Sequence, residues 1–185
     1  MNRDDAWAIL TEYTKTERMR KHALSVEAVM RAAAPKYGGD AETWGIVGML
    51  HDFDYEIHPD EERHPAAGSA ILRERGVPEE IIHAIRCHAP YLHEEYRDGM
   101  DRAILAFDEL TGFVTAVALV RPNKSLAEVD ARAVRKKMKD RAFARAVNRD
   151  DIILGAEKLG VELDENIAFV VEALKPVAAE IGLSA

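Results

Sequence analysis

The sequence predicts an all-α protein folded as a single helical bundle. Apolar residues recur three and four positions apart along the chain, and alternating β-branched runs, which would indicate strands, are absent. Helix-capping and helix-breaking residues separate the periodic segments. A chain of 185 residues with 48% apolar and 31% charged residues suits one globular domain, so we assign residues 1–185 to a single unit.

The periodic segments predict helices at 3–13, 17–34, 41–51, 65–75, 78–88, 100–120, 126–133, 139–147, 149–159 and 164–182. Between the early segments, Pro35 and Gly38-Gly39 end one helix, and Asp40 can cap the next. Gly76 suits a helix end, while Pro65 and Pro78 suit first helical turns.

The later segments have their own boundaries. Ser125-Leu126-Ala127-Glu128 has the form of a capping box, and Asn148 can cap the helix that follows it. Pro176 interrupts the last apolar pattern, which predicts a kink or a split in that helix.

Composition limits the class of protein and its partners. No apolar run approaches the ~20 residues of a membrane span, and no apolar signal segment follows the polar N-terminus. Cys87 is the only cysteine, which excludes an intrachain disulfide, so we expect a cytoplasmic protein. The net charge of −8 argues against a nucleic-acid polymer as the main partner. The sequence does not indicate an oligomeric state.

A basic stretch lies in the C-terminal part of the chain. Its members are Arg132, Arg135, Lys136, Lys137, Lys139, Arg141 and Arg145. We favour a solvated helical face for this stretch. The alternative is a rim that attracts an anionic substrate.

The seven histidines divide by their helical faces. Four of them share a face with apolar residues and are expected to point inward: His22, His51, His64 and His88. Three others are expected to face solvent: His58, His83 and His93. A single inward histidine is usually a hydrogen-bonded core residue, but four of them with aspartates nearby favour metal ligation.

Two aspartates accompany the inward histidines. Asp108 shares a helix face with Ile104, Thr111 and Thr115, where a carboxylate is costly unless it is paired or binds a metal. The alternative for Asp108 is a buried pair with a nearby arginine. Asp52 directly follows His51 at a helix end, where its alternative is an ordinary polar terminus.

Imidazole and carboxylate ligands together suit divalent Fe, Mn, Ni, Co or Zn. A structural zinc site is not expected, because the chain has no cysteine cluster. A carboxylate that contacts two ions suits a two-metal centre, which binds phosphate oxygens and lowers the pKa of bound water.

The order His22, His51-Asp52, Asp108 on helices resembles the HD superfamily of metal-dependent phosphohydrolases. The stretch that begins at His64-Pro65, followed by Ile85-Arg86-Cys87-His88, looks like the HDIG subgroup, which has two further histidines. The resemblance covers about residues 17–125, and we expect the helices of 126–185 to pack on that core. A group of small uncharacterised HD proteins is similar over Asp108–Phe113 and Arg121–Ser125.

The resemblance implies a mononuclear or dinuclear metal centre and hydrolysis of a small phosphorylated metabolite, such as a nucleotide or a dinucleotide polyphosphate. It implies that His22, His51, Asp52 and Asp108 hold one ion. His64 and His88 would hold a second ion, with Asp52 as the bridge. Asp52 is then the catalytic carboxylate, and the expected reaction is attack of metal-bound hydroxide on phosphorus.

Many members of the family have a lysine shortly after the HD pair, whereas this chain reads Phe53-Asp54-Tyr55-Glu56. The Gly-Tyr-Pro motif of cyclic-dinucleotide enzymes is also absent. We therefore expect the phosphate contact to come from other cations, and the candidates are Arg18, Arg20, Arg121 and Lys124. Residues that would orient the attacking water or relay protons are Asp54, Glu56 and Glu109.

Two other functions use similar ligands. One is a diiron oxygenase of the HD type, which would show oxygen uptake and a mixed-valent iron signal. The other is a non-catalytic nucleotide-binding or interaction domain that keeps metal for structure and binds without turnover.

Overall fold

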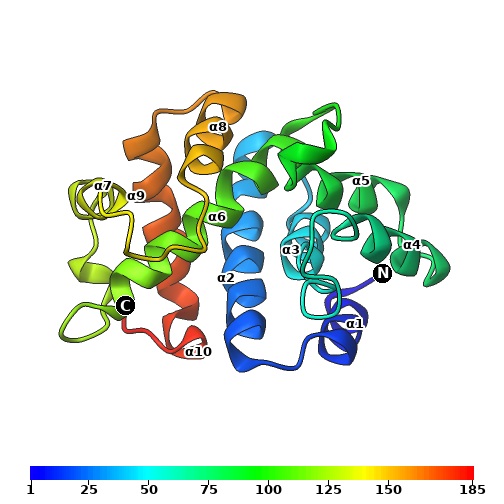
Figure 1. The fold of residues 1–185 in the computed structure, drawn as a ribbon, viewed down its shortest axis with the longest axis horizontal. Coiled ribbons are helices and arrows are strands. Elements are labelled where there is room, and N and C mark those ends of the chain that lie inside the picture. Colours follow the sequence, from blue (N-terminus) through cyan, green and yellow to red (C-terminus); the bar gives the residue numbers. More distant parts are fainter.

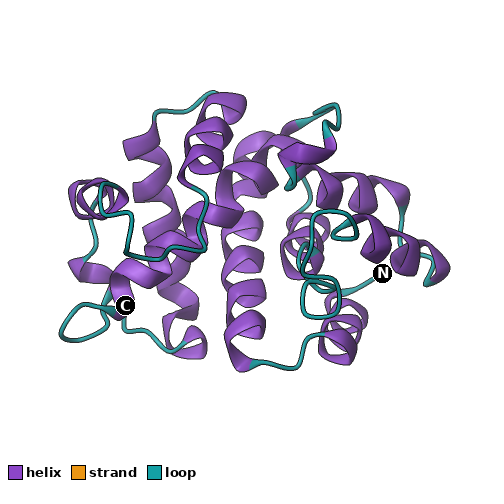
Figure 2. Cartoon of the chain, viewed as in Figure 1, coloured by secondary structure: helices purple, strands orange, loops and turns teal.

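The computed structural model describes residues 1–185, and Figure 2 shows that helices and connecting loops make up the chain. The helices are α1 (Arg3–Tyr13), α2 (Glu17–Ala33), α3 (Ala41–Leu50), α4 (Ala66–Glu74), α5 (Glu79–Cys87), α6 (Gly99–Leu119), α7 (Ala131–Met138), α8 (Arg149–Leu159), α9 (Leu163–Leu174) and α10 (Ala178–Ile181). Pairing of the β type is limited to one isolated bridge between Ser125 and Ser184. The predicted all-α fold is confirmed.

Several helix boundaries follow from capping residues that the sequence analysis identified. Asp40 accepts a hydrogen bond from the Thr43 backbone N–H at the start of α3. Asn148 accepts from the N–H groups at the start of α8. The last predicted helix is divided at Pro176 into α9, a 3₁₀ turn over Lys175–Val177, and α10.

Two predicted helices differ from the structure. In place of a helix over 126–133, Ser125 caps only a 3₁₀ turn (Leu126–Glu128), and α7 begins later because Asp130 caps it. Residues 139–147, predicted to be helical, form successive turns. The reason is a competing donor, since the Arg149 side chain occupies backbone carbonyls that a helix would use internally.

Helix α2 lies at the centre of the molecule, with α3 on one side and α6 crossing it (Figure 1). Gly48 of α3 permits a close approach to α2, because a Cβ there would lie 2.8 Å from the Val26 carbonyl oxygen. Gly155 of α8 permits the same approach to α6, since its Cβ would lie 2.5 Å from the Ala106 Cα. These two contacts pack α3 on α2 and α8 on α6, and α2 in turn packs against α6.

One continuous hydrophobic cluster runs from Ala6 to Leu183, so residues of the C-terminal helices and residues of the N-terminal helices share a core. None of the helices combines the length and the hydrophobicity that a membrane-spanning helix needs.

Candidate metal centre

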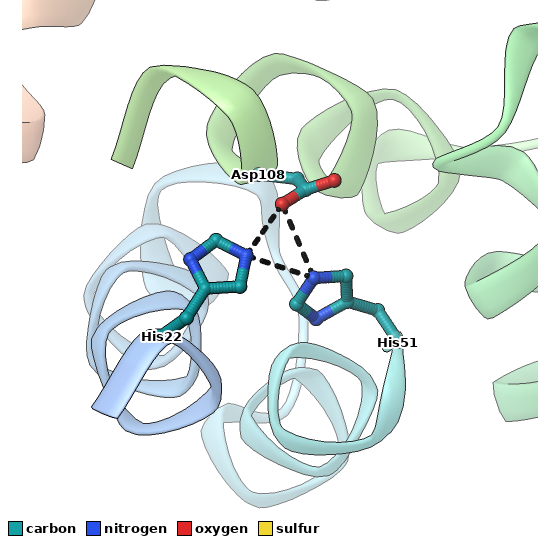
Figure 3. Close-up of side chains that lie close together, drawn as sticks. All are labelled: His22, His51 and Asp108. Atoms are coloured by element: carbon teal, nitrogen blue, oxygen red, sulfur yellow. Dashed lines mark hydrogen bonds and ion pairs between the residues drawn. The ribbon is translucent and has the colours of Figure 1, made fainter. Parts of the chain in front are cut away.

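Three ligand atoms from three helices converge at the centre of the bundle (Figure 3). His22 comes from α2, His51 from the C-terminal end of α3, and Asp108 from α6. Asp108 Oδ1 lies 2.9 Å from His22 Nε2 and 3.1 Å from His51 Nε2, and the two Nε2 atoms are 3.3 Å apart. The structure therefore brings together this part of the predicted ligand set, which we call the first triad.

A second triad adjoins it and consists of Asp52, His64 and His88. Asp52 Oδ1 lies 3.1 Å from His64 Nε2 and 3.6 Å from His88 Nε2. The two histidine Nε2 atoms are 3.1 Å apart. His88 is at the C-terminal end of α5, and His64 lies in the turns that precede α4.

Asp52 connects the two triads. Its Oδ1 atom faces the second triad, while its Oδ2 atom lies 3.5 Å from His51 Nε2 and 3.9 Å from His22 Nε2. Each carboxylate oxygen is therefore directed at a different cluster of nitrogens. This is the placement that a carboxylate bridging two cations requires.

Hydrogen bonds fix how three of the imidazoles present their nitrogens. His51 Nδ1 donates to the Gly48 carbonyl at 2.8 Å, and His88 Nδ1 donates to the Ile85 carbonyl at 2.5 Å. His64 Nδ1 donates to Asp54 Oδ1 at 2.8 Å. In the neutral imidazole, the proton on Nδ1 leaves Nε2 with a lone pair.

The Nε2 lone pairs of His51 and His64 thus face the carboxylate oxygens of Asp108 and Asp52, each at 3.1 Å. A cation at each triad would satisfy these acceptors. Imidazole nitrogen with carboxylate oxygen suits borderline divalent metals. The residues present therefore fit a divalent metal centre.

The electrostatics of the first triad favour ionised carboxylates. Burial tends to raise the pKa of Asp108, but His51 and His22 hold it well below its usual range. Burial tends to lower the pKa of His51, yet the charges of Asp108 and Asp52 raise it well above its usual value. Protons therefore compete with a metal for this triad.

In the second triad, the pKa values of the two histidines shift in opposite directions. Burial opposes the charged form of His64, but hydrogen bonds to Asp52 and Asp54 raise its pKa to about 9. For His88, burial dominates and lowers the pKa. Burial also works against ionisation of Asp52, yet its histidine neighbours, His51 foremost, keep the pKa of this carboxyl well below its usual range.

A cavity of about 760 Å³ opens onto both triads. Its wall includes ligands from both triads, several acidic side chains, two tyrosines, and three cations. Lining side chains other than the candidate ligands include Arg18, Lys21, Tyr55, Tyr91, Glu109 and Arg145. A cavity of this size holds a small metabolite.

The predicted phosphate contacts do not all reach this cavity. Arg18 lines it, whereas Arg20 donates to the Thr14 and Thr11 carbonyls. Arg121 and Lys124 do not line the cavity, which corrects that part of the expectation. Residues of α6 line the cavity as far as Leu119, the last residue of that helix. Beyond it, the Lys124 carbonyl accepts a hydrogen bond from the Ser184 backbone N–H in the C-terminal tail.

Of the three residues considered for proton relay, only Glu109 lines the cavity. Asp54 is fully buried, where it holds His64 and accepts from the Gly68 N–H at 2.9 Å. Glu56 accepts from the Thr16 hydroxyl and joins the start of α2 to the chain that follows α3. Glu109 lines the cavity, and its burial, with the charge of Asp108, raises its pKa to about 8.

His83 was expected to face solvent, and this expectation is wrong. Its side chain is buried, and Nε2 lies 3.1 Å from Asp101 Oδ2 and 3.0 Å from the Glu95 carbonyl oxygen. The segment after α5 folds over this polar helix face. Cys87 lies beside His83, and burial raises the pKa of its thiol to about 12. His93 is exposed as expected.

Comparison with known proteins identifies an HD domain in the part of the chain that contains both triads. The model of the HD domain family matches residues 19–108, a range that starts before His22 and ends at Asp108. Ribonuclease Y from Desulfotalea psychrophila (strain LSv54 / DSM 12343) is 27% identical over 161 residues, which cover 82% of this chain and 30% of that protein. The chain thus spans about 30% of the length of this relative. No solved structure matches the chain significantly.

Proposed function

We propose that the chain, whose residues 19–108 form an HD domain, is a metal-dependent phosphohydrolase that acts on a small phosphorylated metabolite. A nucleotide or a dinucleotide polyphosphate is the favoured substrate. The HDIG type of site, with two ions, is part of the proposal, because it rests on His64 and His88. The observation that supports a two-ion site is the position of Asp52, whose two carboxylate oxygens face different triads.

When bound, two divalent ions would acidify water and offset charge on phosphoryl oxygens. The chain's own residues do the rest. The acceptors at Nδ1 hold His51, His64 and His88 with Nε2 directed into the triads, where these atoms would be available as ligands. Arg18 lies one helical turn before His22 and lines the same cavity, where its guanidinium can hold phosphate through two parallel hydrogen bonds.

A small substrate also agrees with the charge of the cavity. Asp60 and Glu61 lie at its wall together with Asp151. Acidic side chains there repel the continuous phosphate backbone of a polymer. The relative named above is a ribonuclease, so cleavage of RNA is the outcome that would contradict a small-molecule substrate.

A phosphate-release screen tests the reaction. The protein, loaded with Mn²⁺ or Co²⁺, is assayed with nucleoside phosphates, dinucleotide polyphosphates and a short RNA. We expect release from the small phosphates and a loss of at least about 100-fold in Asp108→Ala, because metal catalysis requires the intact site. His93→Ala is the matched control, since this histidine is exposed. Release that survives in Asp108→Ala, or oxygen uptake by the iron form without phosphate release, would contradict the proposal.

Metal content tests the two-ion form. We expect two equivalents in the wild type, about one in His64→Ala or His88→Ala, and disruption of both in Asp52→Ala, because loss of a bridge leaves two cations facing each other. One equivalent in the wild type after reconstitution with excess metal, unaltered in His64→Ala, would rule out this form.

A further inference from the structure

The cavity continues along α6 well beyond the metal ligands. The α6 residues that line it include Asp108, Gly112, Thr115, Ala116 and Leu119. From Asp108 to Leu119 an α-helix rises about 16 Å at 1.5 Å per residue. A single phosphate at the two triads would leave most of this length, and most of the 760 Å³, for the remainder of a ligand.

Part of the wall is the irregular segment of residues 140–148. Five consecutive residues of it, Ala144 to Asn148, line the cavity. The Arg149 guanidinium donates to four backbone carbonyls of this segment, those of Asp140, Phe143, Ala144 and Val147. A segment with so many carbonyls bonded to one planar cation is held in one shape.

The segment is held against α6 at Phe113. The Phe143 ring packs edge-on against the Phe113 ring, with centroids 5.5 Å apart. The Arg149 guanidinium, which braces the segment, lies 4.9 Å from the centroid of the same ring. Phe113 follows Asp108 by about one and a half helical turns on α6, so Arg145, which lies between Phe143 and Arg149 in the chain, stands beside this part of α6.

Arg145 has the surroundings of a ligand contact. It is exposed at the cavity wall and forms no salt bridge within the protein. Arg18 is also exposed at this wall and also forms no salt bridge. The third lining cation, Lys21, pairs with Glu17 at 2.6 Å. Two guanidinium groups, one from α2 and one from the irregular segment, are therefore left to complement an anion.

We propose that segment 140–148, braced by Arg149, presents Arg145 to a second phosphate of the substrate, with Arg18 as the other contact. The substrate class is then a compound with two or more linked phosphates, and not a monophosphate. This inference rests on the proposed function. It concerns residues that lie outside the matched HD domain, which ends at residue 108.

Binding of stable phosphate analogues tests the proposal without turnover. The metal-loaded protein is titrated by calorimetry with methylphosphonate and with methylenediphosphonate, in the presence of excess free metal. We expect tighter binding of the diphosphonate by the wild type, and a loss of about tenfold or more for that ligand in Arg145→Ala, since a hydrogen bond to a charged group is worth that much. Binding of methylphosphonate should stay unchanged.

Arg141→Ala is the matched control, because Arg141 is an exposed arginine of the same segment that does not line the cavity. It should bind both ligands as the wild type does. Equal affinity of the wild type for the two ligands would overturn the proposal. An Arg145→Ala variant that weakens both ligands alike, or neither, would also overturn it.

The role of Arg149 as a positioning residue has its own test. Arg149→Lys cannot donate to four carbonyls, so we expect it to lose preference for the diphosphonate while its metal content is retained. In the Arg145→Ala background the same change should have no further effect on that preference. An undiminished further loss would show that Arg149 acts through general stability.

These outcomes are separable from the failure of the proposed function. If the enzyme assay shows no phosphate release from any compound, the hydrolase proposal fails. The calorimetric preference for two phosphates, and its dependence on Arg145, is still measured in that case and decides the binding site alone.

Discussion

Asp54 provides the sharpest test of how the second triad is built. It is fully buried and does not line the cavity, so a substitution there leaves the substrate-facing wall intact. Its Oδ2 accepts from the Gly68 N–H at 2.9 Å, and its Oδ1 accepts from His64 Nδ1 at 2.8 Å. The change of interest is Asp54→Asn, which retains the size of the side chain and replaces one acceptor by a donor.

The structure decides which end of the amide faces which neighbour. The Gly68 N–H needs an acceptor, so the Asn oxygen takes that position and its NH₂ group faces His64 Nδ1. Nδ1 must then accept, which moves the imidazole proton to Nε2, the atom that faces His88. Loss of such a supporting contact typically costs 10–100-fold in metal affinity, or about 1.4–2.7 kcal/mol.

The assay is a metal titration of the chelator-stripped protein. Asp54→Asn should bind the second ion 10–100-fold more weakly than the wild type while the first ion keeps its affinity, which corresponds to the typical cost given above. Asp40→Asn is the control, because this residue caps a helix far from the metal centre and Asn caps equally well. Unchanged affinity for both ions in Asp54→Asn, or an equal loss of both, would refute the reasoning.

Two further predictions concern stability. His83→Ala should lower the free energy of unfolding in urea by about 2–4 kcal/mol, because it removes the imidazole and leaves the buried Asp101 carboxyl with the Arg97 backbone N–H as its remaining partner. The exposed His93→Ala should change this free energy by less than about 0.5 kcal/mol, and similar midpoints for the two variants would contradict the prediction. The free energy of unfolding of the metal-free protein should fall by up to about 3 kcal/mol as the pH rises from 6.5 to 9. The reason is that the pKa of His64 is raised to about 9 in the folded protein, so its stabilising contribution is complete below the pKa of the unfolded chain and is lost above the pKa of the folded one. The raised pKa of Glu109, about 8, adds a loss of the same sign, and a flat urea profile over this range would contradict the prediction.

The candidate ligands were predictable because helical periodicity records which face of a helix is buried. His22 and Asp108 stand on apolar stripes, and such positions rarely tolerate a polar group without a partner. Periodicity gives direction and not distance, however. The convergence of Nε2 of His22, Nε2 of His51 and Oδ1 of Asp108 within about 3 Å depends on the close packing at Gly48, which pattern analysis does not measure.

His83 shows where periodicity fails. Its helix face carries Glu79, Glu80 and Arg86, and that composition indicates a solvated surface. The structure covers this face with the segment after α5, where Arg86 pairs with Glu94 at 2.6 Å. Burial of a polar face by a distant loop is a tertiary effect, and the helix sequence alone has no record of it.

The helix prediction for residues 139–147 was wrong for a related reason. Its composition suits a helix, but a helix needs its own carbonyls as acceptors, and Arg149 binds four of them from outside the segment. Ala144 also has a positive φ of 42°, which a continuous right-handed helix does not allow. The competition is visible only once Arg149 is placed in space beside the Phe113 ring.

The histidines differ in how their orientation is secured, and this difference indicates which metal site can be tuned. His51 and His88 each stand at the C-terminal end of a helix, and each donates to the carbonyl three residues earlier in the last turn of that helix. Such a support is made of backbone and survives substitution of any neighbouring side chain. His64 lies in a turn and depends on the side chain of Asp54. In the proposed two-ion form, the affinity of the second ion, and hence the ratio of two-ion to one-ion protein, would therefore be adjustable through Asp54, a single residue that does not line the cavity.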